Sequence, residues 1–136
     1  MIAILLVTHG HFGAELLKSA ELIAGQQEDV ETISLNKEDS IQEFGDVVRQ
    51  KIASLLSHRN KLLVLTDLFG GSPSNVTAAN LKSMGFKCLS GVNLPMLLEA
   101  LILRNGTDDL DQLSSKVMKS GVDGIKDINQ ILLKSK

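Results

Sequence analysis

The stretch Met1-Ile-Ala-Ile-Leu-Leu-Val-Thr-His-Gly-His-Phe-Gly13 decides the fold of this chain. Its apolar run Ile2–Val7 has the length of a strand, and such an unbroken run is typical of a strand buried on both faces in a parallel sheet. The following residues, Ala14–Ala24, place apolar side chains at helical spacing. We therefore predict a strand, a tight glycine-containing turn and a helix, with His9 where the strand ends.

The rest of the chain repeats this alternation of strand and helix. The order of the elements predicts an α/β fold, in which one three-layer domain has a mostly parallel central sheet with helices on both faces. We expect strands at about 2–7, 30–35, 61–66 and 86–90, and helices at about 13–24, 41 to 58–60, 72–84, 95–103 and 109–120.

The sequence after Gly121 fits two structures. Apolar side chains recur there every three or four residues, which is typical of a helix. Glycines interrupt the pattern, however, and a short strand near Gly124–Ile128 fits equally well. The tail is also too apolar for a free terminus, so we expect a second copy of the chain to bury it.

Length and composition indicate one soluble globular domain over residues 1–136, with 43% hydrophobic and 22% charged residues. The net charge of −2 and the absence of Trp and Tyr argue against nucleic acid as a partner. No apolar run approaches the roughly 20 residues of a membrane span, and the N-terminus lacks the features of a signal peptide. The single cysteine, Cys88, fits a reducing cytoplasm, and we interpret it as a buried structural thiol.

Three turns follow predicted strands, at 8–13, 67–74 and 91–95, and they carry the candidate functional residues. Because the carboxyl ends of parallel strands meet at one edge of a sheet, these turns should lie together and form the ligand site. We expect the other two histidines, His11 and His58, to be solvated surface residues. The candidate site residues are Thr8, His9, Asp67, Gly70, Gly71, Ser72 and Asn93.

An imidazole that is hydrogen-bonded to a carboxylate can act as a nucleophile or a base in this arrangement. If Asp67 accepts one ring N–H of His9, it fixes the tautomer and leaves the other ring nitrogen with a free lone pair. Gly70 and Gly71 would let backbone N–H groups approach an anion, and the helix that begins near Pro73 would direct its positive end to the same place. A neutral, nucleophilic imidazole that faces an anion cradle is what a reversible phosphohistidine requires.

Other chemistries would use the same residues. A hydrolase would take Ser72, the expected N-cap of the third helix, as nucleophile, with His9 as base and Asp67 as orienting group. Against it, the chain has no Gly-x-Ser-x-Gly elbow, and Pro73 has no N–H to act as the oxyanion donor that usually follows the nucleophile. A metal site of His9, His11 and Asp67 lacks further ligand spacing, and no glycine-rich nucleotide loop follows a strand.

Three separated segments resemble the mannose-type enzyme IIA of the bacterial phosphoenolpyruvate-dependent sugar phosphotransferase system. They are Leu6-Val-Thr-His-Gly-His-Phe-Gly13, Asp67-Leu-Phe-Gly-Gly-Ser-Pro-Ser-Asn75 and Gly91-Val-Asn-Leu-Pro-Met-Leu-Leu-Glu99. The resemblance covers almost the whole chain. It implies that His9 takes a phosphoryl group from the phosphocarrier HPr and passes it to a IIB component, that Asp67 orients His9, and that Ser72 lies beside the phosphoryl group. The transfer requires no metal or cofactor, because the donor is itself a phosphohistidine.

The resemblance also implies an oligomeric state, a cellular location and a set of partner proteins. The family has an antiparallel last strand that is exchanged between the subunits of a homodimer, which favours a strand near Gly124–Ile128. Since the chain stops at Lys136 without an Ala/Pro-rich linker, we expect a free-standing cytoplasmic IIA with a separate IIB partner and, indirectly, membrane IIC and IID components. A phosphocarrier for dihydroxyacetone kinase is the nearest alternative, although the 91–95 turn resembles the sugar branch better.

Overall fold

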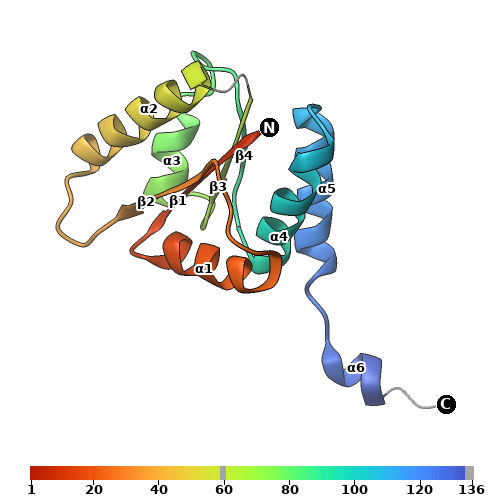
Figure 1. Cartoon of the computed structure of the whole chain (residues 1–136). Coiled ribbons are helices and arrows are strands. Elements are labelled where there is room, and N and C mark those ends of the chain that lie inside the picture. The colour runs from red at the N-terminus through yellow and green to blue at the C-terminus, as the bar shows by residue number, and fades with distance from the viewer. Residues whose placement is uncertain (59–60, 134–136) are drawn as a thin grey trace.

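Four parallel strands form the sheet in the computed structural model, which describes residues 1–58 and 61–133 (Figure 1). They are β1 (Ala3–His9), β2 (Val30–Leu35), β3 (Leu62–Thr66) and β4 (Lys87–Leu89), and they lie in the order β2-β1-β3-β4. β1 and β3 therefore occupy the middle of the sheet, where each pairs on both sides. Their nearly continuous apolar sequences suit strands that are covered on both faces.

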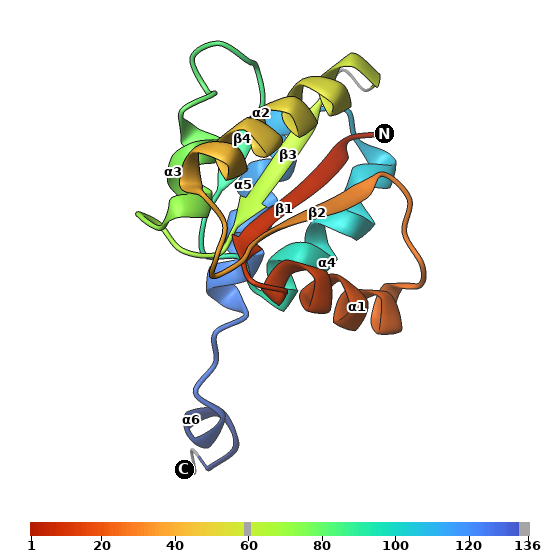
Figure 2. The ribbon, with the colours of Figure 1, turned by 90° about the vertical axis from the view of Figure 1, so that its left-hand side faces the viewer.

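Helices cover both faces of this sheet, which gives a single α/β domain with three layers (Figures 1 and 2). The helices are α1 (Phe12–Ala24), α2 (Ile41–His58), α3 (Ser72–Ala78), α4 (Leu94–Leu103), the 3-10 turn η1 (Arg104–Gly106), α5 (Leu110–Asp123) and α6 (Ile128–Leu133). The continuation of α2 that was expected at residues 59–60 lies outside the described residues. In the described part of the chain, no helix is long and apolar enough to cross a membrane.

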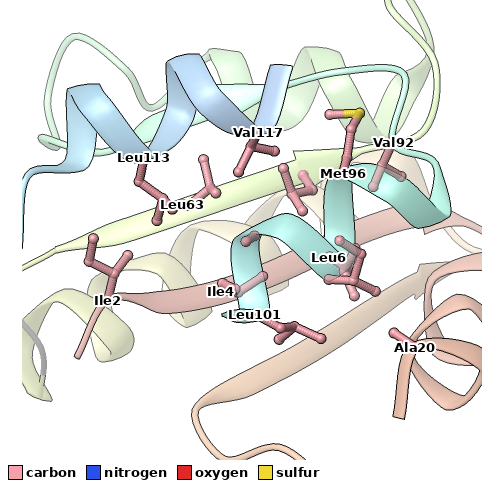
Figure 3. Close-up of a cluster of buried hydrophobic side chains, with 13 residues drawn as sticks. Ile2, Ile4, Leu6, Ala20, Leu63, Val92, Met96, Leu101, Leu113 and Val117 are labelled. Atoms are coloured by element: carbon pink, nitrogen blue, oxygen red, sulfur yellow. The ribbon is translucent and has the colours of Figure 1, made fainter. Parts of the chain in front are cut away.

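Successive side chains of β1 point to opposite faces of the sheet and enter two separate apolar clusters. Ile4 and Leu6 join a cluster with residues of α1, α4 and α5, which Figure 3 shows. Leu5 and Val7 join a second cluster with residues of α2. All four side chains are fully buried, and each contributes roughly 1.5–3 kcal/mol by leaving water. β1 is thus anchored from both sides, and the residue at its end, His9, has a fixed place.

The third helix differs from the prediction at both ends. Gly71, and not Ser72, is the N-cap, and Ser72 is the first helical residue. The helix ends at Ala78, six residues earlier than expected. The next backbone N–H groups, those of Asn80 and Leu81, bond to the carbonyl three residues earlier, as in a tight turn. The other predicted boundaries of the described elements agree with the structure within three residues.

The expected antiparallel strand near Gly124–Ile128 does not form within the single chain, and its exchange in a dimer stays a prediction. Among the described residues all strand pairs are parallel, and no strand forms after β4. Instead α6 begins at Ile128, where Asp127 accepts the backbone N–H of Gln130 at 3.1 Å as an N-terminal cap. The segment after α5 leads away from the sheet, so it has no strand to pair with, and its helical apolar spacing decides its structure (Figures 1 and 2).

Cys88 lies in β4 and packs against the apolar cluster that contains α2. Burial raises the pKa of its thiol to about 11. The thiol is therefore protonated at neutral pH and is a poor nucleophile, since the thiolate is the reactive form. This environment supports the interpretation of Cys88 as a structural residue.

Candidate functional site

His9 and Asp67 meet at the carboxyl edge of the sheet because their strands are neighbours. β1 pairs with β3 in parallel, with Val7 opposite Thr66, so the two chains leave the sheet side by side. Asp67 Oδ2 accepts the backbone N–H of His9 at 2.9 Å, and it lies 2.9 Å from Nδ1 of the same residue. One carboxylate oxygen thus holds the histidine at two points, and the contact that the sequence predicts is present.

This contact determines which ring nitrogen of His9 is free. An ionised carboxylate only accepts hydrogen bonds, so Nδ1 donates its hydrogen to Asp67 and Nε2 keeps its lone pair. The His9 side chain is 48% exposed, whereas that of Asp67 is 13% exposed, so an incoming reactant reaches the imidazole and not the carboxylate. Within the described residues Asp67 Oδ1 is buried without a hydrogen-bond partner, so the carboxylate serves His9 alone.

Gly71 gives the His9 ring the space that it occupies. A Cβ atom at this position would lie 2.9 Å from Cε1 and 3.5 Å from Nε2 of His9, which is too close to the first of these atoms. The φ of −78° at Gly71 is ordinary, so the glycine is required for space and not for its backbone conformation. Its N–H donates to the carbonyl of Leu68 at 3.1 Å, so the structure uses this N–H to close the turn.

Two hydroxyl groups that the sequence analysis missed support the same turn. Thr66 Oγ1 lies 2.7 Å from Ser74 Oγ, and Ser74 Oγ donates to the carbonyl of Leu68 at 2.6 Å. The backbone carbonyl of Thr66 accepts the N–H of Val92 at 3.0 Å. A polar residue at the end of the apolar run of β3 was the signal that could have identified Thr66.

Two predicted ligand-binding residues hold turns instead. Thr8 is fully buried, and its Oγ1 accepts the N–H of Gly13 at 2.8 Å. Asn93 is the N-cap of α4: its Oδ1 accepts the N–H of Met96 at 3.0 Å, and its Nδ2 donates to the carbonyl of Gly121 at 3.1 Å. The hydrogen bonds of both side chains fix the loops around the site, so we assign neither of them to a ligand.

The other two predicted residues of this turn, Gly70 and Ser72, flank Gly71 in the sequence. Ser72 begins α3 and directly follows Gly71, whose backbone lies against the imidazole. Gly70 is exposed and has a φ of +87°, which is in the left-handed region that favours glycine. Gly70 therefore allows the sharp change of direction between β3 and α3.

The remaining histidines lie on the surface, as the sequence predicts. His11 is exposed just before α1, and His58 is exposed at the end of α2, where its Nδ1 lies 2.8 Å from the carbonyl oxygen of Ser54. Over residues 1–58 and 61–133, no group of three or more His, Cys, Asp and Glu side chains is arranged to hold a metal ion.

Comparison with known proteins identifies the family of this chain. The family model EIIA-man, described as "PTS system fructose IIA component", matches residues 3–118. This chain belongs to the EIIA-man family. The match includes β1, which ends at His9, and β3 with the whole turn that follows it, in which Asp67 lies.

Relatives of this EIIA-man chain include a protein named as an EIIA component and a longer protein named as an EIIAB component. It is 29% identical to the fructose-specific EIIA component of Bacillus subtilis over 140 residues, which cover 96% of this chain and 95% of the relative. It is 32% identical to the mannose-specific EIIAB component of Escherichia coli over 126 residues. That alignment covers 92% of this chain but 39% of the relative, so the chain spans about two fifths of the length of the EIIAB protein.

Solved structures of other EIIA proteins share the fold. An EIIA component from Streptococcus agalactiae superposes with a TM-score of 0.86 at 39% identity, covering 96% of this chain and 99% of the other. A IIA protein associated with the fucose utilization operon of Streptococcus pneumoniae gives a TM-score of 0.82 at 27% identity, covering 97% and 99% of the two chains. The sheet and the helices on its two faces are thus those of known EIIA domains.

We predict that Gly71→Ala displaces the His9 ring while leaving the fold intact. The new Cβ would meet Cε1 at 2.9 Å, so the imidazole must turn away and its hydrogen bond to Asp67 is lost. Nitrogen-15 NMR of labelled histidine should then show a mixture of tautomers in place of a single Nδ1–H form. Gly85→Ala is the matched control, because nothing lies within 4 Å of a Cβ there. An unchanged His9 signal in Gly71→Ala would show that Gly71 does not set the ring position.

Proposed function

We propose that this EIIA-man chain is a phosphocarrier of a sugar phosphotransferase system. In this proposal, His9 accepts a phosphoryl group from phospho-HPr and passes it to a IIB component, which delivers it to the sugar together with membrane IIC and IID components. The observation that carries the proposal is the hydrogen bond between His9 Nδ1 and Asp67 Oδ2, because it leaves Nε2 as the nucleophile on a half-exposed ring.

The proposed step is an in-line displacement at phosphorus. The Nε2 lone pair of His9 forms the new N–P bond while the N–P bond of the donor phosphohistidine breaks, and its electron pair returns to the donor ring. His9 becomes positively charged as it attacks, and the carboxylate of Asp67 stabilises that charge through Nδ1. Transfer to IIB is the reverse displacement, with His9 as the leaving group.

The surface beside His9 suits a protein as phosphoryl donor. Leu68 and Phe69 directly follow Asp67, and their side chains are 59% and 87% exposed. Large apolar side chains of this kind beside a nucleophile are typical of protein contact surfaces. The names of the relatives refer to mannose, fructose and sorbose systems, which favours a sugar system over dihydroxyacetone kinase. The unpaired Cys88 agrees with a cytoplasmic location for this exchange.

We also propose that the chain forms a homodimer through its C-terminal segment. Large apolar side chains after α5 are each more than half exposed in the single chain, on a segment that projects from the domain (Figure 1). Burying them against a second copy would remove this surface from water. They are Ile125, Ile128, Ile131, Leu132 and Leu133.

The first prediction from the proposed function concerns covalent phosphate. Incubation with phosphoenolpyruvate, enzyme I and HPr should give one phosphate per chain that is labile in acid and stable in base, as a phosphoramidate is. It should be absent in His9→Ala and present in His11→Ala, His58→Ala and Ser72→Ala. The reason is position, because among the residues that the structure describes only His9 has an imidazole fixed by a carboxylate. Acid-stable phosphate that disappears in Ser72→Ala would support a serine nucleophile and contradict the proposal.

The second prediction concerns Asp67. Asp67→Asn should retain the fold but slow transfer from phospho-HPr by about tenfold or more, because the neutral amide neither fixes the tautomer as strongly nor stabilises the imidazolium. Single-turnover transfer measured by rapid quench tests this. Asp46→Asn is the control, since Asp46 pairs with Arg49 on the exposed face of α2. If the two variants transfer phosphate equally fast, Asp67 has no part in the reaction.

The third prediction concerns assembly. The full chain should sediment as a dimer at micromolar concentration, and truncation after Gly124 or the substitution Ile131→Asp should yield monomers. Leu22→Asp, which places the same charge on an exposed apolar position of α1, should remain dimeric. A full-length chain that sediments as a monomer would refute the proposed dimer and leave the phosphocarrier proposal unaffected.

A further inference from the structure

The turn that carries Asp67 is held from the inside by two buried hydroxyl groups. Thr66 is the last residue of β3 and is fully buried, and Ser74 in the first turn of α3 is 7% exposed. Their oxygen atoms are 2.7 Å apart, and Ser74 Oγ is 2.6 Å from the carbonyl oxygen of Leu68. These hydroxyl groups connect the end of the strand to the peptide that follows Asp67.

The direction of the two hydrogen bonds follows from the number of hydrogens. A carbonyl oxygen only accepts, and Ser74 has a single hydroxyl hydrogen, so Ser74 donates it to Leu68. Thr66 must then donate to Ser74. The two bonds therefore run in one direction, from Thr66 through Ser74 to Leu68, and in such a chain each bond polarises and strengthens the next.

This chain of hydroxyl groups helps to hold Asp67 in place, together with the Leu68–Gly71 turn that borders the His9 ring. The carbonyl of Leu68 also accepts the N–H of Gly71 at 3.1 Å, so it is the point where the turn closes. A Cβ atom built on Gly71 would lie 3.3 Å from this carbonyl and 2.9 Å from His9 Cε1, so both groups border the same space. A shift of the Leu68 peptide would therefore disturb the carboxylate on one side and the ring on the other.

We propose that Thr66 and Ser74 are positioning residues for phosphoryl transfer, which keep Asp67 where it holds His9 in the Nδ1–H tautomer. This inference rests on the proposed function. Neither hydroxyl touches the reacting nitrogen, and both act through the turn from Asp67 to Gly71. Loss of this hydroxyl chain would leave the Leu68 carbonyl with fewer donors and let the turn relax. A misplacement of about 1 Å at a reacting centre slows a reaction by about a hundredfold.

The test combines a spectroscopic measurement with a transfer rate. Nitrogen-15 NMR of labelled histidine, at about pH 9, well above the ordinary histidine pKa of about 6.5, reports the tautomer of His9 without any phosphate. In Ser74→Ala we expect a mixture of tautomers and a transfer rate from phospho-HPr that is lower by about tenfold or more. Thr66→Val should have a smaller effect in the same direction, since Ser74 can still donate to Leu68, and Thr66→Ser should restore the wild-type behaviour.

Thr77→Val is the matched control for the loss of a buried hydroxyl. Thr77 is fully buried in the same helix, and its Oγ1 donates to the carbonyl of Pro73 at 2.8 Å, away from the turn. This variant should lose thermal stability and keep the wild-type tautomer and rate. If Ser74→Ala also keeps both while losing similar stability, its hydroxyl is merely structural and the inference is overturned.

The two measurements separate this inference from the proposed function. A shifted tautomer in Ser74→Ala, together with wild-type protein that takes no phosphate from a competent phospho-HPr, would refute the phosphocarrier proposal and support the positioning of His9 by Ser74. Equally rapid transfer in the wild type and in Ser74→Ala would support the phosphocarrier proposal and refute the positioning role of Ser74. The NMR measurement on folded Thr66→Val provides the same decision if Ser74→Ala does not fold.

Discussion

The contact between Asp67 Oδ2 and His9 is the interaction on which the site depends. One carboxylate oxygen accepts both the backbone N–H and the ring Nδ1–H of the same residue, each at 2.9 Å. The first hydrogen bond fixes the backbone position of His9, and the second fixes the orientation of its ring. Together they leave a single nitrogen, Nε2, available for chemistry on a half-exposed ring.

The parallel sheet makes this contact possible. β1 and β3 are adjacent and parallel, so the segments that follow them leave the sheet at the same edge and in the same direction. β1 is fixed by alternating side chains in two apolar clusters, and the turn after β3 is fixed by the hydroxyl groups of Thr66 and Ser74. Gly71 completes the arrangement by leaving room for the ring. The position of one imidazole nitrogen thus follows from packing several residues away.

The sequence predicts those parts of the structure that follow from periodicity and from the order of the elements. The pairing of His9 with Asp67 needed only the rule that parallel strands end at one edge. The roles of Thr8 and Asn93 were not predictable in this way, because a polar side chain near a site has the same pattern whether it faces a ligand or caps a turn. The tail was ambiguous for a related reason, since its apolar spacing indicates a buried face but not the partner that buries it.

The most direct test of this account is to identify the nitrogen of His9 that carries the phosphate. Protein labelled with nitrogen-15 histidine and phosphorylated by phospho-HPr can be examined by NMR, where coupling to phosphorus marks the bonded ring nitrogen. Because Asp67 occupies Nδ1, the account predicts phosphate on Nε2 of His9 alone. Phosphate on Nδ1, or on a residue other than His9, would contradict the claim that the carboxylate selects the nucleophile.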